Sequence, residues 1–249
     1  MRVGILVQAR MSSSRLPGKV LIPILKKPLL CYLLERLQRV DASDALVVAT
    51  STDQSDDPIV AYCDSIGVTA FRGDLNDVLK RFCDAATHYS LDAVVRICGD
   101  SPLIDPELVS RGIQLYRKAP IDCLTTLLGS EEGRGLPRGQ EIEIIARSAL
   151  ERANALAKAA DEREHVTPFL YRHPELFRLE SYRGPYPDLE SQRWVVDEQA
   201  DLDFVRALIE GIYPQSPKMS FEEIVDYLAH HPELLEINRH VAQYRIPSQ

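Results

Sequence analysis

Four short apolar runs alternate with helical patterns, and this alternation constrains the fold of the chain most strongly. The runs are rich in β-branched residues, which is typical of buried strands. They are residues 2–7, 45–50, 68–71 and 93–98. The segments between them have helical spacing of apolar residues, over residues 28–40, 56–66 and 76–90. Strands that alternate with helices predict an α/β fold, a mostly parallel sheet with right-handed crossovers and flanking helices.

The second half of the chain is less regular. Its patterns predict helices over residues 106–118, 147–160, 162–172 with a break near Pro168, 202–213 and 221–230, and strands over residues 122–128, 141–145 and 177–182. Residues 129–139 are rich in glycine and charge, which predicts a mobile loop. A chain of 249 residues fits one domain, 1–249. Residues 128–194 are expected to form a smaller lid or dimerisation insertion within it.

The stretch Gln8–Lys19 (QARMSSSRLPGK) differs in kind from the apolar run before it. It contains the cations Arg10, Arg15 and Lys19, three serines in a row and a Leu-Pro-Gly turn. A loop that leaves the first strand of a parallel sheet opens into the crevice where such sheets bind ligands. Cations, hydroxyls and free backbone N–H groups are the donors that a triphosphate requires. The alternative is a solvated surface loop whose cations face water.

This loop resembles the nucleotide-binding signature of the cytidylyltransferases that make CMP-activated acidic sugars. That group includes CMP-sialic acid and CMP-Kdo synthetases, and the branch called spore-coat polysaccharide biosynthesis protein F is the most similar. The Ala9-Arg10 opening favours this group over UDP- or dTDP-sugar enzymes, which have a more glycine-rich loop. The resemblance implies a Rossmann-like fold of the nucleotide-diphospho-sugar transferase type, although GxGxxG is absent. It also implies a nucleotide site made by Gln8, Ala9, Arg10, Ser12, Ser13, Ser14, Arg15 and Lys19.

A second group surrounds Asp100, in the run RICGDSPLID over residues 96–105. The strand ends at Gly99 and the acid follows at once, which places it at the crevice. Mg²⁺ accompanies triphosphates and prefers carboxylate and phosphate oxygens. The alternative is a turn or N-cap aspartate, and Asp105 before Pro106 fits that alternative better. The run also matches the GD-x-P pattern of the family, which implies that Gly99 binds nucleotide and that Asp100 binds Mg²⁺ and is catalytic together with Arg10, Arg15 and Lys19.

The third group is Arg193–Asp197 (RWVVD), an apolar run that ends in an acid. By itself the pattern is equally that of a helix start. The family has an R-x-T/V-V-D motif, and the resemblance therefore implies that Asp197 is a second Mg²⁺ ligand. The sequence does not show whether Asp100 and Asp197 converge.

Three further segments are candidates by resemblance. Arg72 and Gly73 match the segment that contacts the cytosine edge, while a capped helix with Asp74 or Asn76 fits the same residues. Arg138, Gln140 and Glu141 match the acceptor loop and strand, with a linker arginine and an exposed strand edge as the alternative. His165 lies in the run EREHVTP of the same branch, and a structural histidine is the simpler interpretation.

Composition limits the partners. A net charge of −8 argues against a nucleic-acid partner, but a nucleotide needs only local cations. No apolar run is long enough to span a membrane, and the five cysteines have no zinc-like spacing, so we expect a cytoplasmic protein with reduced core thiols. A homodimer is expected from the resemblance.

The resemblance implies transfer of CMP from CTP to an acidic sugar or related acceptor, with Mg²⁺ as cofactor and pyrophosphate as product, for surface glycan precursors. One rival is a sugar-phosphate nucleotidyltransferase that uses GTP or UTP. The other is a non-catalytic nucleotide-binding protein or a glycosyltransferase. The latter would require a DxD metal motif, and Asp201-Leu202-Asp203 has that spacing, although helix capping explains it better.

Overall fold

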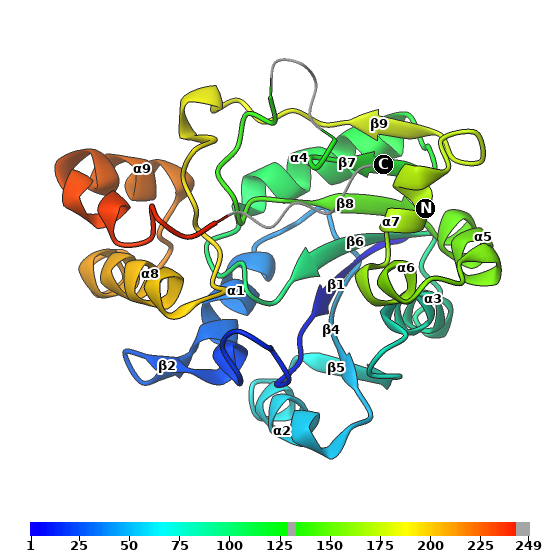
Figure 1. The fold of residues 1–249 in the computed structure, drawn as a ribbon, viewed down its shortest axis with the longest axis horizontal. Helices are drawn as coiled ribbons and strands as arrows, with labels where there is room; N and C mark the ends of the chain where they lie inside the picture. The colour runs from blue at the N-terminus through cyan, green and yellow to red at the C-terminus, as the bar shows by residue number, and fades with distance from the viewer. Residues whose placement is uncertain (129–132, 243–249) are drawn as a thin grey trace.

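The computed structural model describes residues 1–128 and 133–242. Its centre is a seven-stranded sheet with the order β5-β4-β1-β6-β8-β7-β9 (Figure 1). The strands are β1 Val3–Gln8, β4 Ala45–Ser51, β5 Thr69–Gly73, β6 Ala93–Cys98, β7 Cys123–Thr125, β8 Glu143–Ala146 and β9 Leu179–Ser181. Only β8 runs against its neighbours β6 and β7, and the other pairs are parallel. The predicted mostly parallel α/β sheet is therefore confirmed.

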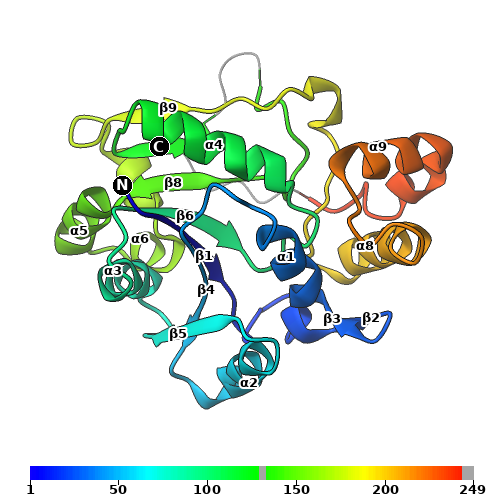
Figure 2. The same cartoon turned by 180° about the vertical axis from the view of Figure 1, so that it is seen from behind.

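Helices cover both faces of the sheet. One face carries α1 Leu29–Leu37, α2 Asp57–Ser65 and α4 Pro106–Lys118, and the other carries α3 Val78–His88, α5 Arg147–Leu156, α6 Ala160–His165 and α7 Pro168–Arg172 (Figures 1 and 2). The remaining helices, α8 Gln199–Ile212 and α9 Phe221–His230, lie beyond the carboxyl end of β6 (Figure 1). Their apolar core, which includes Trp194 and Phe204, closes that end of the molecule.

The two faces follow from alternation along the strands. On β1, Val3, Ile5 and Val7 pack into the core under α1 and α4, while Leu6 packs into the core under α3 and α5. Successive side chains of a strand point to opposite faces, so an apolar run covered on both sides becomes a central strand. The same alternation decides which face of the sheet each side chain at the end of a strand reaches.

The sequence patterns placed most elements within a few residues, and the exceptions have local causes. The predicted helix 147–160 is wrong as one element, because Ala157 and Ala159 have extended backbones between α5 and α6. The predicted break near Pro168 is confirmed, since this residue lacks an N–H and opens α7. A short hairpin, β2 Pro23–Ile24 with β3 Lys27–Pro28, was not predicted. The strand expected over residues 122–128 extends only over β7.

The predicted insertion, residues 128–194, supplies β8, β9 and α5 to α7 where it is described. Part of the predicted mobile loop, residues 129–132, lies outside the described residues. A lid or dimer role for the segment stays a prediction. All five cysteines are free thiols, and four of them are buried. Among the described residues, no helix combines the length and apolar character needed to cross a bilayer.

Candidate active site

The loop after β1 is folded back on itself. The Gly18 amide donates to the Met11 carbonyl over 2.8 Å, and Gly18 has a positive φ of 72°. A left-handed backbone favours glycine, which explains the Leu-Pro-Gly turn. The Met11 amide donates over 2.7 Å to the buried Asp56 carboxylate, which anchors the loop to the start of α2. The loop therefore returns its last cation, Lys19, to the carboxyl end of the sheet.

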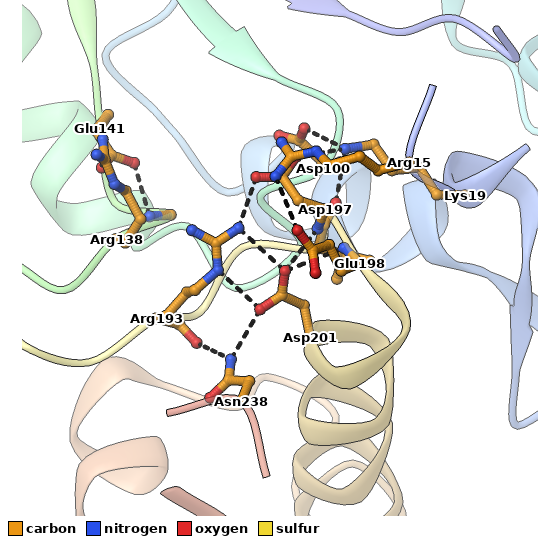
Figure 3. Close-up of polar contacts among 12 residues, drawn as sticks. Arg15, Lys19, Asp100, Arg138, Glu141, Arg193, Asp197, Glu198, Asp201 and Asn238 are labelled. Carbon is orange, nitrogen blue, oxygen red and sulfur yellow. Dashed lines mark hydrogen bonds and ion pairs between the residues drawn. The ribbon is translucent and has the colours of Figure 1, made fainter. Parts of the chain in front are cut away.

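Lys19 contacts both Asp100 and Asp197, two acids that lie far apart in the sequence (Figure 3). Its Nζ donates to Asp100 Oδ2 over 2.6 Å and to Asp197 Oδ1 over 3.0 Å. A third bond goes to the Val196 carbonyl over 2.7 Å. The ammonium group is thus surrounded by acceptors from the turn after β6 and from the segment before α8. Asp100 and Asp197 do converge, on a position that one cation can fill.

Burial and the neighbouring charges shift the pKa values of Lys19 and Asp197. Burial lowers the pKa of Lys19, but Asp100 and Asp197 outweigh it, and the net pKa is raised above the usual 10.5. Burial raises the pKa of Asp197, but Lys19, Arg15 and Arg193 outweigh it and hold that pKa below its usual range. Both groups are therefore charged at neutral pH.

Arg193 holds the carboxylates of Asp197 and Asp201 in place. Arg193 donates over 2.7 Å to Asp197 Oδ2 and over 2.8 Å to Asp201 Oδ1. Asp201 is completely buried and its Oδ2 also accepts from the backbone amides of Asp197 and Glu198. This buried carboxylate caps the start of α8 and fixes the turn on which Asp197 stands. The capping interpretation of Asp201 is confirmed.

Two backbone contacts hold the cluster against the sheet. The Val196 amide donates to the Asp100 carbonyl over 2.8 Å, which fastens the Asp197 segment to the end of β6. The Gly99 amide donates to the Gln8 carbonyl over 2.8 Å, and a Cβ on Gly99 would lie 2.9 Å from that oxygen. Glycine is needed there because the loop after β1 passes so closely.

The remaining cations of the loop also have acidic partners. Arg15 reaches Asp197 over 3.0 Å and Glu198 over 3.4 Å. Arg10 reaches Glu164 of α6 over 2.8 Å. Ser12, Ser13 and Ser14 follow Arg10 in the same loop. The three cations of the loop therefore all pair with acidic side chains at the carboxyl end of the sheet.

Other predicted residues lie at the same end of the sheet with different partners. The Arg72 guanidinium donates to the carbonyls of Ser51 and Asp53 and forms a 2.7 Å ion pair with Asp57. His165 is half-buried at the end of α6, and burial is the first cause of its lowered pKa. Gln8 accepts from the Arg96 guanidinium, and Ala9 is buried.

The predicted acceptor residues form a separate group (Figure 3). The Glu141 carboxylate lies 3.3 Å from Arg138, 2.9 Å from Arg134, and accepts from the Gly139 amide over 2.7 Å. Gln140 is completely buried, and its amide bonds the Leu103 carbonyl and the Asp105 amide. Gln140 therefore holds the segment between β6 and α4 in place, and it could contact an acceptor only if those two bonds broke. Asp105 caps α4, as the alternative predicted.

The backbone ties this group to the cluster. Residues 138 and 193 form a parallel bridge, in which the Arg138 amide donates to the Gln192 carbonyl and the Trp194 amide donates to the Arg138 carbonyl. Arg193, which binds Asp197, is thus the direct backbone neighbour of Arg138. Sequence reasoning missed Arg193 and Glu164 as functional neighbours. The pair of Glu164 with Arg10 joins segments 154 residues apart and has no local pattern. Arg193 lies four residues before Asp197, and that spacing was the signal that could have found it.

Comparison with known proteins identifies the chain. The profile of the Cytidylyltransferase family matches residues 4–242. The chain belongs to this family. A cytidylyltransferase from Leptospira borgpetersenii has a solved structure with a TM-score of 0.87, 31% identity, and coverage of 98% of this chain and 100% of that one. The family resemblance of the loop is therefore confirmed.

Two curated relatives of this cytidylyltransferase carry functional names. The spore coat polysaccharide biosynthesis protein SpsF of Bacillus subtilis is 31% identical over 234 residues, 92% of this chain and 94% of the relative. An 8-amino-3,8-dideoxy-manno-octulosonate cytidylyltransferase of Shewanella amazonensis is 33% identical over 132 residues, 52% of this chain and 53% of the relative. The similarity to the first covers nearly the whole chain, and that to the second about half.

Proposed function

We propose that this cytidylyltransferase transfers CMP from CTP to a small acidic sugar or a related acceptor and releases pyrophosphate. The observation that carries the proposal is the meeting of Lys19 with Asp100 and Asp197 beneath the cationic loop. Cations for phosphates and paired carboxylates on one position are the parts that phosphoryl transfer needs. The names of the relatives support a glycan precursor as the product.

Asp100 and Asp197 would hold Mg²⁺. The donor set fits this ion, because both carboxylates already reach one cation of the protein, the Lys19 ammonium. Among the described residues, no three acidic, histidine or cysteine side chains gather as a complete metal site. A magnesium site with one or two carboxylates, completed by phosphate oxygens and water, has this composition. When bound, Mg²⁺ would neutralise part of the charge on the phosphates.

The side chains of the loop do the positioning. Arg15 and Lys19 exchange their present acidic partners for the β- and γ-phosphates, and Arg10 does the same on leaving Glu164. A hydroxyl oxygen of the acceptor attacks the α-phosphorus in line and loses its proton to solvent. The new bond from phosphorus to this oxygen forms as the bond to pyrophosphate breaks, and no covalent enzyme intermediate is needed. Orientation and charge stabilisation supply the rate.

The acceptor side is assigned to Arg138 and Glu141, which form an ion pair just before β8, where residue 138 bridges residue 193. A guanidinium at this place suits a carboxylate on the acceptor. We also propose a homodimer and a cytoplasmic location. A DxD glycosyltransferase receives no support, since Asp201 is buried and bonded to Arg193.

The test has two parts. Thermal shifts with ATP, CTP, GTP and UTP, each with Mg²⁺, should show the largest stabilisation by CTP, because a ligand that binds the native state stabilises it. Pyrophosphate release should then appear with CTP and one member of a panel of acidic sugars. The Asp100→Asn variant should lose turnover while it keeps its melting temperature within a few degrees. Preference for another nucleotide, or near-normal turnover of Asp100→Asn, contradicts the proposal.

A further inference from the structure

Asn238 is a buried polar residue near the end of the described chain. It follows the short 3₁₀-helix η4 Pro232–Glu236 and lies 45 residues beyond Arg193 in the sequence. Only 4% of Asn238 is exposed, whereas the side chain of the next residue, Arg239, is 75% exposed. The Val241 amide donates to the Asn238 carbonyl over 3.0 Å, which closes a turn at this position. The amide group of Asn238 is therefore held inside the protein while its neighbour faces water.

The side-chain amide of Asn238 contacts two residues of the candidate active site (Figure 3). Its Nδ2 donates to the Arg193 carbonyl over 2.8 Å and to Asp201 Oδ1 over 3.0 Å. A carbonyl and a carboxylate only accept hydrogen bonds, so both N–H groups of the amide are used here. Arg193 and Asp201 are 6% and 0% exposed, which shields these bonds from water. One side chain thus fastens the backbone of Arg193 and the carboxylate of Asp201.

The Asp201 carboxylate is the centre of this arrangement. Besides the bond from Asn238, its Oδ1 accepts from Arg193 Nε over 2.8 Å. Its Oδ2 accepts from Arg193 Nη2 over 3.1 Å, and from the backbone amides of Asp197 and Glu198 over 3.0 and 3.1 Å. The same Nη2 of Arg193 donates to Asp197 Oδ2 over 2.7 Å. Asn238 is therefore connected to the proposed metal ligand Asp197 through Arg193 and Asp201.

Attachment of the C-terminal segment does not explain this amide. Three apolar side chains of the segment pack against the core formed by α8 and α9: Leu234, Leu235 and Ile237. A buried amide costs free energy unless its groups are bonded, so another apolar side chain would serve attachment alone better. Such a side chain would remove the Asn238 donor from the Arg193 carbonyl and from Asp201 Oδ1. The use that remains for Asn238 is to fix the orientation of these two residues.

We propose that Asn238 is a positioning residue for the Mg²⁺ site: it fixes Arg193 and Asp201, and through them the orientation of the Asp197 carboxylate. The inference deepens the proposed function and rests on it. A carboxylate that ligates a metal is itself held by hydrogen bonds, and loss of these outer partners weakens metal binding by about 10- to 100-fold. Asn238 acts one step further from the ion, so its loss should cost about 10-fold, the lower end of that range. The segment after α9 is then part of the active site.

The test measures CTP binding by calorimetry without an acceptor, once with excess Mg²⁺ and once with EDTA. The ratio of the two dissociation constants is the metal enhancement, the factor by which Mg²⁺ tightens CTP binding. The Asn238→Asp variant keeps the shape of the side chain but places another carboxylate against Asp201 in place of a donor. Its metal enhancement should fall by about 10-fold. CTP binding in EDTA should stay within about 2-fold of the wild type, because the cations of the loop remain.

Two further variants calibrate this measurement. Asp197→Asn shows the size of a complete loss of the proposed ligand. Asn154→Asp is the matched control on α5, where the Asn154 side-chain oxygen accepts from Arg163 over 2.8 Å, so that an added negative charge faces a cation. It should keep the wild-type metal enhancement.

An unchanged metal enhancement in Asn238→Asp, with or without a lower melting temperature, would make Asn238 merely structural and overturn the inference. An equal loss of CTP binding with Mg²⁺ and with EDTA would indicate a general distortion of the site and overturn it also. A wild type without metal enhancement, or one matched by Asp197→Asn, overturns the proposed Mg²⁺ site itself. Should Asn238→Asp not fold, Asn238→Ser, which keeps one donor on a shorter side chain, decides the matter: a loss of at least about 3-fold is expected, and an unchanged enhancement refutes the inference.

Discussion

Replacement of Lys19 by methionine tests the cluster on which the site is built. Its ammonium bonds Asp100 and Asp197, and its side chain is only 9% exposed, while the two acids are 22% and 20% exposed. Methionine keeps the apolar stem and removes the charge. The variant therefore leaves two carboxylates facing each other without the cation that holds them together.

The cost can be estimated from the geometry. Two carboxylates about 5 Å apart repel by about 3 kcal/mol at an effective dielectric constant of about 20. Removal of one partner of a fully buried pair costs about 3–5 kcal/mol, and the partial exposure of both acids lowers that figure. We expect Lys19→Met to lose about 2–3 kcal/mol of unfolding free energy at pH 7, measured by urea denaturation.

The lost stability should depend on pH and on Mg²⁺. In the wild type, the pKa of Asp197 is lowered, so its contribution is present above the usual carboxyl pKa and is lost as pH falls through the lowered value. Without Lys19 that loss should begin at higher pH. If the acids bind Mg²⁺, the ion should stabilise the variant by about 1.4 kcal/mol at ten times its dissociation constant.

The matched control is Lys80→Met, which removes an exposed helical pair with Asp84. Its stability should change by less than about 0.5 kcal/mol, because exposed pairs contribute little. A Lys19→Met variant as stable as this control, or one that Mg²⁺ does not stabilise more than the wild type, would refute the reasoning.

Three other outcomes are expected. Gly139→Ala should lower stability by more than about 1 kcal/mol in urea denaturation, because Gly139 has a φ of 99° and a Cβ would lie 2.8 Å from the Trp194 backbone; a neutral effect would contradict it. Glu164→Gln should tighten CTP binding by about 2- to 5-fold at low salt, as titration would show, since Arg10 loses its acidic competitor; weaker binding would mean that the pair supports the site. The lowered pKa of His165 predicts that unfolding free energy falls as pH drops below about 6.5, and His165→Gln should flatten that slope; an unchanged slope would exclude His165 as its source.

The sequence by itself determined the type of fold and indicated the cationic loop and the acid after Gly99 as candidate functional residues. The alternation of β-branched runs with helical spacing indicated a mostly parallel sheet. This pattern can be read from the sequence because the periods of strands and helices depend only on neighbouring residues. The cationic loop and the acid after Gly99 were readable for the same reason: a loop at the end of a central strand opens to the crevice in every such sheet.

Only the tertiary structure decided which side chains meet. Asp197 lies about 100 residues beyond Asp100, and their shared contact with Lys19 exists because Val196 is fastened to the end of β6. The partners of Arg72 were equally invisible, since its bonds to the Ser51 and Asp53 carbonyls depend on how β5 pairs with β4. Contacts between distant segments follow from packing, strand order and register, and these are properties of the whole chain that no local pattern carries.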